Sequence, residues 1–234
     1  MSQPQYAQEK LLAIQERIKR AVLTANREPS CIRLIGASKQ QTPELIGEYL
    51  ELGLHNLGEN YLQEAVTKIE SLSSFKPNWH FIGQIQSNKT KVIAEHFHWV
   101  HGVDRLKIAK RLAAQNTQQR SLKLLIQLNL DDEHSKAGIA LTDAPALADE
   151  IAQHIAEDGK AELRGFMAIP KARKSKSDQA AIFAKARELL TTTNQRYGLQ
   201  MDQLSMGMSG DLEAAIQEGA TMVRIGTDLF GTRK

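Results

Sequence analysis

The feature of this sequence that most constrains its fold is a regular alternation between short apolar segments and longer amphipathic segments. Eight strand-like segments occur at residues 32–37, 55–58, 79–83, 98–102, 122–128, 161–169, 203–206 and 221–226. The stretches between them carry apolar residues at helical spacing. Strands that alternate with helices predict a parallel sheet. Eight such units within 234 residues predict a single (β/α)8 (TIM) barrel, a fold that typically takes about 250 residues.

The first helix of the repeat shows how clearly some boundaries are marked. Thr42, Pro43 and Glu44 supply an N-cap, a first-turn proline and a first-turn acid, which together are typical of a helix start. Gly219 is expected to end the last helix before the final strand. The other predicted helices cover residues 61–72, 88–95, 105–115, 144–156, 179–197 and 212–218. Residues 1–234 are therefore expected to form one domain, with residues 1–28 as an extra N-terminal helix centred on residues 6–26.

Other classes of protein fit less well. A doubly wound open sheet usually has a glycine-rich turn after its first strand, whereas this turn reads Ser38-Lys39-Gln40-Gln41. The single cysteine, Cys31, cannot form an intrachain disulfide, and the start MSQPQYAQEK lacks the apolar core of a secretory signal. No apolar run approaches the roughly 20 residues of a membrane-spanning helix. We therefore expect a soluble, cytoplasmic protein.

Charge gives a hint about the ligand. The net charge of +3 is too small to indicate nucleic acid by itself, but it suits a small anion. The basic stretch Lys171–Asp178 is expected to be a solvated crossover loop, because no aromatic residues interleave its cations as they would in an RNA-binding segment.

Two loops have the chemistry of a phosphate site. In a barrel of this class the ligand lies at the carboxyl ends of the strands, and phosphate is commonly held by the loops after strands seven and eight. Those loops read Gly207-Met208-Ser209-Gly210 and Gly226-Thr227. Glycine lets the backbone approach an anion closely, and the hydroxyl groups are donors. Glycine and serine are also ordinary turn residues, so the prediction of a phosphate site depends on the barrel context.

Lys39 ends the first strand, where its side chain would point into the barrel mouth. A desolvated lysine amine can lose its proton and form a Schiff base with a carbonyl. A lysine at a strand end is more often simply solvated, but a phosphate site lies across the same mouth. An aldehyde and a phosphate on one ligand describe pyridoxal 5'-phosphate (PLP).

Arg224 lies in the eighth strand. Alternation places Met222 and Arg224 on one face and Val223 and Ile225 on the other. Because the apolar pair should face the helices, Arg224 is expected to point inward, where a buried guanidinium needs a partner. That partner is either a carboxylate in the barrel core or the pyridine nitrogen of PLP. A permanent cation there would keep the ring nitrogen unprotonated and make the ring a weaker electron sink.

Several segments carry a family resemblance: LIGASK up to Lys39, the run Gly58 to Tyr61, WHFIGQIQSNK from Trp79 to Lys89, SMGMSGDLEAAI, and TMVRIGT. Over almost its whole length the chain resembles the PLP homeostasis (PLP-binding) protein family, whose barrel is similar to the N-terminal barrel of alanine racemase. The resemblance implies a PLP aldimine on Lys39 and Arg224 at the ring nitrogen. It also implies phosphate contacts from Ser209, Gly226 and Thr227, with Asn60 and His80 near the ring face and its hydroxyl. Met206 is expected to pack against the site through its thioether. The segment Glu133–Gly138 follows the family pattern only in part, so neither Glu133 nor Lys136 is assigned a role.

The resemblance also implies a function. It implies that the protein keeps free PLP low and balances amino-acid and vitamin B6 metabolism, without established catalysis. Alanine racemases carry a second, β-rich domain that supplies a catalytic tyrosine across the dimer, whereas this chain ends at Lys234, directly after the eighth unit. We therefore expect a monomeric PLP carrier without catalytic residues, with PLP-dependent apoenzymes as candidate partners. The alternatives are a PLP-dependent amino-acid racemase that uses Lys39 as its base, and a lysine aldolase acting on a sugar phosphate, which would be colourless.

The histidines allow other interpretations. His96, His98 and His101 fall within six residues, a spacing that suggests metal ligands. If they occupy the fourth strand, His96 and His98 share one face and His101 takes the other. No cysteine or carboxylate completes a typical ligand set, so no metal is expected. His80 has the alternative role of a core histidine with a backbone partner.

Overall fold

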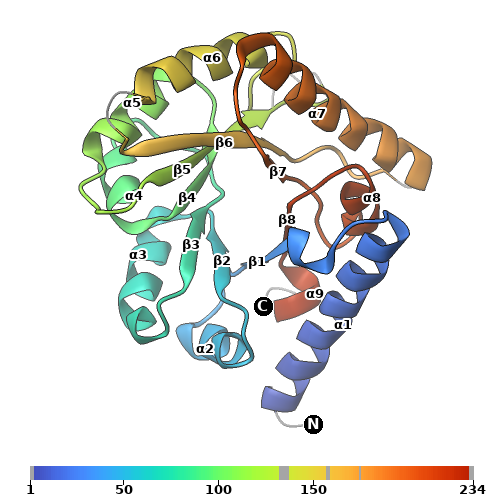
Figure 1. Cartoon of the computed structure of the whole chain (residues 1–234). Coiled ribbons are helices and arrows are strands. Elements are labelled where there is room, and N and C mark those ends of the chain that lie inside the picture. The colour runs from blue at the N-terminus through green and yellow to red at the C-terminus, as the bar shows by residue number, and fades with distance from the viewer. Residues whose placement is uncertain (1–2, 132–136, 157–158, 174, 232–234) are drawn as a thin grey trace.

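A closed barrel of eight parallel strands forms the centre of the computed structural model (Figure 1). The structure describes residues 3–131, 137–156, 159–173 and 175–231. The strands are β1 (Arg33–Ala37), β2 (Asn56–Glu59), β3 (Asn78–Phe81), β4 (Trp99–Val103), β5 (Leu122–Leu128), β6 (Ala161–Ala168), β7 (Gln203–Ser205) and β8 (Met222–Ile225). They lie in chain order, and β8 pairs with β1 to close the ring. The predicted (β/α)8 barrel is confirmed, and the open-sheet alternative is wrong.

Helices surround the strands (Figure 1). They are α2 (Pro43–Glu51), α3 (Leu62–Ser71), α4 (Thr90–His96), α5 (Leu106–Gln115), α6 (Ala144–Ile155), α7 (Lys176–Tyr197), α8 (Leu212–Gln217) and α9 (Thr227–Phe230), with short 3-10 turns at η1 (Pro29–Cys31) and η2 (Ser73–Phe75). Thr42 caps α2 as predicted, since its side chain accepts a hydrogen bond from the Leu45 N–H. The helix α7 begins at Lys176, earlier than predicted, because Ser175 caps it by accepting from the Asp178 N–H. Part of the predicted basic loop is therefore helix.

The extra N-terminal helix, α1 (Gln3–Thr24), packs outside the barrel against α8 and α9 (Figure 1). Its buried face includes Leu11, Ile14, Ile18 and Val22, whereas Leu12 is 52% exposed. Burying each large aliphatic side chain stabilises the fold by about 1.5–3 kcal/mol. This helix therefore shares one hydrophobic cluster with α8 and α9.

The core has two parts, which follow from strand alternation. Outward-facing side chains pack between the strands and the helices in one large cluster, which includes Val223 and Ile225. A small second cluster fills the barrel interior and consists of Ile35, Trp99, Leu125, Met167 and Met222. The predicted faces of β8 are confirmed.

The region around the histidines differs from the prediction. His96 is the last residue of α4 and its Nδ1 lies 2.9 Å from the Val92 carbonyl oxygen, whereas β4 begins only at Trp99. The expectation that His96 and His98 share a strand face is therefore wrong, because one lies in a helix and the other in the turn after it. Within the described part of the chain, no three His, Cys, Asp or Glu side chains are grouped as metal ligands would be.

Among the residues that the structure describes, no helix is both long enough and apolar enough to cross a membrane.

Candidate functional site

The backbone next to Lys39 is fixed by a buried polar network. Lys39 follows β1 at the carboxyl end of the barrel and is half-buried. The preceding Ser38 donates from its hydroxyl to Glu59 Oε1 at 2.6 Å. Lys68, on α3, donates from Nζ to the Ser38 carbonyl at 2.7 Å and to Glu59 Oε1 at 2.9 Å. Ser38 and Glu59 are fully buried and Lys68 is 3% exposed, so this network holds the end of β1 against α3.

The residue after Lys39 is held in the same way. Gln40 adopts a left-handed backbone conformation with φ of 61°, which is uncommon for a residue other than glycine. Its N–H donates to Glu64 Oε1 at 2.5 Å, and that oxygen also accepts from Lys68 Nζ at 2.5 Å. Lys68 therefore links the residues on both sides of Lys39.

Burial and charge oppose each other inside this network. Burial raises the pKa of Glu59, and the ammonium group of Lys68 limits that rise. A buried ion pair of this kind is costly to break, because removing one partner leaves an uncompensated charge. The network therefore favours one position for the strand end that carries Lys39.

Arg224 points into the barrel from β8, as predicted, and is 4% exposed. Its Nη1 donates to the carbonyl and to the hydroxyl of Ser205, at 2.6 and 2.5 Å, and its Nη2 donates to the Ala168 carbonyl at 2.9 Å. These partners are neutral, in contrast to the carboxylate considered from the sequence. Burial lowers the pKa of Arg224 to about 10, so the guanidinium stays charged at neutral pH.

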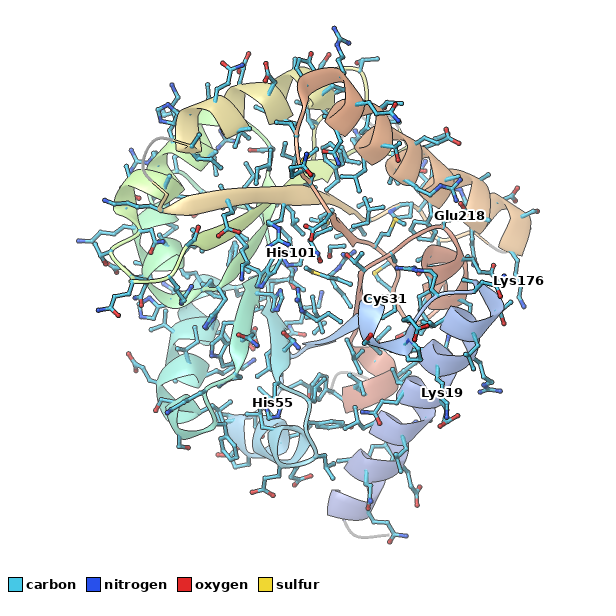
Figure 2. All side chains as sticks on the ribbon, in the orientation of Figure 1. Lys19, Cys31, His55, His101, Lys176 and Glu218 are labelled. Carbon is cyan, nitrogen blue, oxygen red and sulfur yellow. The ribbon has the colours of Figure 1, made fainter. Side chains whose placement is uncertain are left out.

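A chain of hydrogen bonds runs from Arg224 through the barrel. His101 Nδ1 lies 2.9 Å from Ser205 Oγ, and His101 Nε2 lies 3.0 Å from His80 Nδ1. His80 Nε2 lies 3.2 Å from Asn56 Oδ1. Figure 2 shows His101 inside the ring of strands. We call these five residues the interior chain.

The two ends of the interior chain fix its direction. Arg224 can only donate and Asn56 Oδ1 can only accept. With both rings neutral, His80 therefore donates from Nε2 to Asn56 Oδ1, His101 donates from Nε2 to His80 Nδ1, and the Ser205 hydroxyl donates to His101 Nδ1. Burial holds the pKa of both His80 and His101 well below 6.5, which agrees with neutral rings. Arg224 is thus fixed by groups that all accept from it.

The loops after β7 and β8 are tied together by the extra helix. Arg17, on α1, donates from Nη2 to the Ser209 carbonyl at 2.8 Å and from Nη1 to Asp228 Oδ2 at 2.9 Å. It also donates from Nε and Nη2 to Glu213, at 2.7 and 3.0 Å. Ser209 belongs to the first predicted phosphate loop, and Asp228 directly follows the second, Gly226-Thr227. Arg17 therefore holds the two loops beside each other.

Asn60 follows β2 at the same end of the barrel. Its Oδ1 is buried and has no hydrogen-bond partner among the described residues, which is uncommon for a buried acceptor. A Cβ at Gly83 would lie 2.2 Å from the Asn60 carbonyl oxygen, so only glycine lets the two strand ends approach. A cavity of about 620 Å³ opens beside Asn60 and Gly83, with Tyr61 and Lys89 also in its lining. Asn60 thus offers an unused acceptor near a cavity.

His80 and Met206 are placed deeper than the mouth. His80 is fully buried, uses both ring nitrogens in the interior chain, and stacks on Trp99 with ring centroids 5.7 Å apart. It is a core histidine whose partners are side chains, and a contact with a ring at the mouth stays a prediction. Met206 is 1% exposed and packs in the outer core cluster. Glu133 and Lys136 lie outside the described residues.

The structure places four of the predicted site residues on neighbouring strands. Lys39 follows β1, Asn60 follows β2, Arg224 lies in β8, and the loop with Ser209 follows β7. These four strands are neighbours in the closed sheet. Sequence reasoning missed the roles of Arg17, Lys68, Ser205 and His101. Strand alternation alone could have placed the last two inside the barrel.

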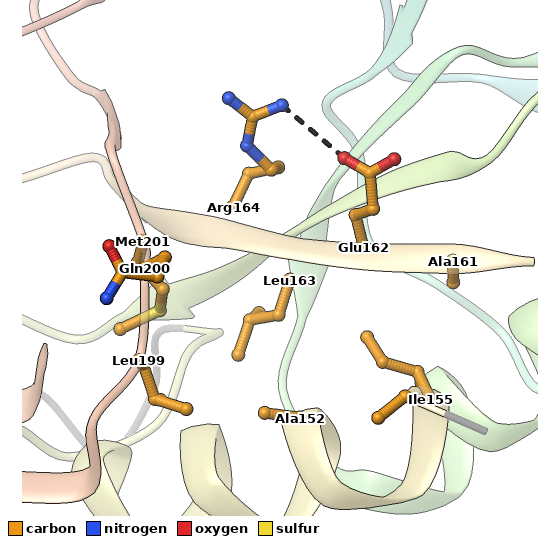
Figure 3. A pocket seen from close by; sticks show the side chains of 10 residues that line it. Ala152, Ile155, Ala161, Glu162, Leu163, Arg164, Leu199, Gln200 and Met201 are labelled. Atoms are coloured by element: carbon orange, nitrogen blue, oxygen red, sulfur yellow. Dashed lines mark hydrogen bonds and ion pairs between the residues drawn. The ribbon is translucent and has the colours of Figure 1, made fainter. Parts of the chain in front are cut away.

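A separate cavity of about 390 Å³ lies between α6 and the amino-terminal end of β6 (Figure 3). Its lining is mainly apolar and includes Ile155, Leu163 and Met201, with an ion pair of 3.5 Å between Arg164 and Glu162 at its edge. None of the predicted site residues lines it.

Comparison with known proteins identifies the family. The sequence profile of the alanine racemase N-terminal domain matches residues 13–234. The pyridoxal phosphate homeostasis protein of Pseudomonas aeruginosa is 49% identical, over 96% of this chain and 95% of that protein. The chain belongs to the pyridoxal phosphate homeostasis protein family. The protein of that name from Escherichia coli K12 is 42% identical over 95% of both chains.

Solved structures agree with this assignment. PipY of Synechococcus elongatus, described with PLP bound, has a TM-score of 0.77 and 34% identity, over 93% of this chain and all of PipY. Alanine racemase from Corynebacterium glutamicum has a TM-score of 0.66 at 14% identity, and the match covers 94% of this chain and 61% of that enzyme. At that identity the likeness concerns the barrel fold alone.

Proposed function

We propose that this protein binds PLP covalently through Lys39 at the carboxyl end of the barrel, and that it serves in cellular PLP balance without catalytic turnover. The observation that carries this proposal is that Lys39, Arg224 and the loops after β7 and β8 belong to three neighbouring strands, β7, β8 and β1. A ligand with an aldehyde, a basic ring nitrogen and a phosphate matches that set of groups.

The residues present fit the chemistry of PLP. Ser209, Gly226 and Thr227 would hold the phosphate, in loops that Arg17 ties together. The unpaired acceptor of Asn60 suits the ring hydroxyl, which is a donor. When bound, PLP supplies an electrophilic aldehyde and an electron-withdrawing ring.

Arg224 supports a role in binding rather than turnover. Its pKa of about 10 keeps it protonated at neutral pH, so it donates to a ring nitrogen without transferring a proton. An unprotonated pyridine ring withdraws electrons less strongly than a protonated one. The same arrangement occurs on a barrel whose relatives are named for homeostasis rather than for a reaction.

The wider function follows from the family. We infer a cytoplasmic, monomeric protein whose whole chain acts as one PLP-binding domain and which delivers PLP to apoenzymes. The PLP-bound PipY structure and the names of the relatives support PLP as the ligand.

Borohydride trapping tests the covalent attachment. The untreated protein should show the visible absorption of bound PLP, which a lysine aldolase would lack. After reduction and digestion, the pyridoxyl mass should be found on the peptide that contains Lys39. A Lys39→Ala variant should lose the absorption band, whereas Lys89→Ala, a matched change beside the mouth cavity, should keep it. A label on another lysine in the wild-type protein would contradict the proposal.

A second assay tests the absence of turnover. PLP-loaded protein is mixed with single enantiomers of small amino acids, and optical rotation is followed over many equivalents of substrate. We expect no sustained change. Continuous inversion that is lost in Lys39→Ala would make the protein a racemase.

A further inference from the structure

The amino-terminal end of the barrel, opposite the proposed PLP site, contains a cavity of about 790 Å³. It lies between α1, η1 and the first residues of β1 and β2, and it adjoins β7. Its polar lining includes Lys19, Arg33, His55, Asn56, Gln203 and Thr221, and the lining contains no aspartate or glutamate. Figure 2 labels three residues that line this cavity: Lys19 of α1, Cys31 of η1, and His55, which directly precedes β2.

Arg33 is the central group of this cavity. It is the first residue of β1 and is half-buried. Its Nη1 is buried without a hydrogen-bond partner, and its guanidinium forms no ion pair within the part of the chain that the structure describes. A guanidinium carries five N–H donors, and leaving a buried donor without a partner is costly. Arg33 therefore has unused capacity to bind an acceptor.

The surroundings of Arg33 are rich in positive charge. Three cations lie over the indole of Trp99: the guanidinium of Arg33 at 4.9 Å, the ammonium of Lys123 at 5.3 Å and the guanidinium of Arg164 at 5.8 Å from its centroid. Of these, Arg164 is paired, with bonds of 2.9 and 2.6 Å to Asp202. Burial and then the charge of Arg164 lower the pKa of Arg33, against the opposing effect of Asp202. The aromatic ring holds the Arg33 guanidinium in place but does not neutralise it.

We propose that this cavity binds a small oxyanion, either a phosphate or a carboxylate, through Arg33, with Lys19 as a second cation. An oxyanion matches the planar donor fork of a guanidinium, which binds such groups through two parallel hydrogen bonds. It would supply the missing acceptor and the missing negative charge at the same time. Asn56, Gln203 and Thr221 offer further hydrogen-bonding groups from neighbouring strands.

Calorimetric titration of the PLP-loaded protein tests this site, since bound PLP blocks the phosphate loops at the other end. Inorganic phosphate and succinate are titrated separately at constant ionic strength, with sodium chloride as the reference. We expect saturable binding of one equivalent of at least one of them, and the tighter of the two identifies the class of anion. Absence of saturable binding of either anion would overturn the proposal.

Three variants locate the bound anion. Arg33→Gln should weaken binding at least about tenfold, the loss expected for a charged hydrogen bond. Lys19→Gln, on the exposed surface of α1, should weaken it by a smaller factor with no risk to folding. Lys110→Gln removes a surface cation from α5 and should have no effect. Unchanged binding in both Arg33→Gln and Lys19→Gln would place the anion elsewhere and overturn the proposal.

Tryptophan fluorescence gives an independent readout. The chain has two tryptophans, so Trp79→Phe leaves Trp99, which contacts Arg33, as the one emitter. As the anion is titrated, the Trp99 emission should change over the same concentration range as the calorimetric signal. In the double variant Trp79→Phe with Arg33→Gln, the anion should leave the emission unchanged. The PLP absorption of Arg33→Gln shows whether that variant is folded. Equal affinity in folded Arg33→Gln and wild type would refute the assignment.

Discussion

Replacing Lys68 by methionine should strongly destabilise the fold. Lys68 Nζ makes three hydrogen bonds, two to carboxylates and one to the Ser38 carbonyl. Methionine keeps the apolar length of the side chain but leaves Glu59 as a fully buried carboxylate whose Oε2 already lacks a partner. Breaking a buried ion pair from one side costs about 3–5 kcal/mol. That is a large fraction of the stability of a typical domain, about 5–15 kcal/mol.

The loss should depend on pH with a defined sign. Burial already raises the pKa of Glu59, and removing Lys68 raises it further because that cation favours the ionised form. A carboxyl whose pKa is higher in the folded state binds more protons when folded, so stability falls as pH rises from the unfolded pKa through the folded pKa. The destabilisation of Lys68→Met should therefore be smallest near pH 5 and should grow toward neutral pH.

Urea unfolding of the apo-protein at pH 5 and pH 7.5 measures both effects. The control is the double variant Lys68→Met with Glu59→Gln. This variant has no uncompensated buried carboxylate, and the side-chain oxygen of the introduced glutamine can still accept from the Ser38 hydroxyl. This variant should recover most of the stability and lose the added pH dependence. A loss below about 1 kcal/mol for Lys68→Met, the range of an exposed ion pair, would refute the argument from burial. So would an equal loss in the double variant.

Three other predictions concern separate parts of the molecule. Gly83→Ala should destabilise by about 3 kcal/mol, since its Cβ would lie 2.2 Å from a backbone oxygen. Gly47→Ala, in α2 with open space around it, should instead stabilise by about 0.5–1 kcal/mol, and urea unfolding measures both. Arg17→Met should weaken PLP binding about tenfold in a spectroscopic titration, because it removes the hydrogen bonds that hold the loops after β7 and β8, which are proposed to bind the phosphate. Arg20→Met, on the same helix but bonded only within it, should leave PLP affinity unchanged. The free energy of unfolding should fall as pH decreases below about 6.5, at up to about 1.4 kcal/mol per pH unit for each buried neutral histidine. Burial lowers the pKa of His98 to about 4, so the unfolded state takes up the proton, and His98→Gln should make this pH dependence less steep.

The fold could be predicted from the sequence because its signals are local. Periodicity along β8 was enough to place Arg224 inside and Val223 outside, and each predicted strand lies within two residues of an observed one. The boundary errors also have local causes. At α7 the capping role of Ser175 extends the helix to Lys176, three residues before the predicted start.

The positions of the candidate site residues in the fold could be predicted from the sequence, but their contacts could not. Lys39 and the phosphate loops could be placed because the fold class fixes which strand ends face the mouth. Lys68 and Ser38 are 30 residues apart, and Arg17 and Ser209 are 192 apart. The spacing of residues in the sequence does not predict that such pairs meet, because their contact depends on how α1 and α3 pack against the closed barrel.

The interior chain lies between these two cases. Alternation assigns His101 and Ser205 to the barrel interior, but it does not say which polar side chains meet there. That depends on the stagger of the strands, including the irregular register between β4 and β5. Once these contacts are known, the positions of the protons on Ser205, His101 and His80 can be worked out from them. Because Asn56 Oδ1 can only accept and burial keeps both histidine rings neutral, each ring carries one proton and every proton between Asn56 and Arg224 is assigned. In that arrangement every polar group of the interior chain is satisfied, and each hydrogen-bond partner of Arg224 accepts from its guanidinium.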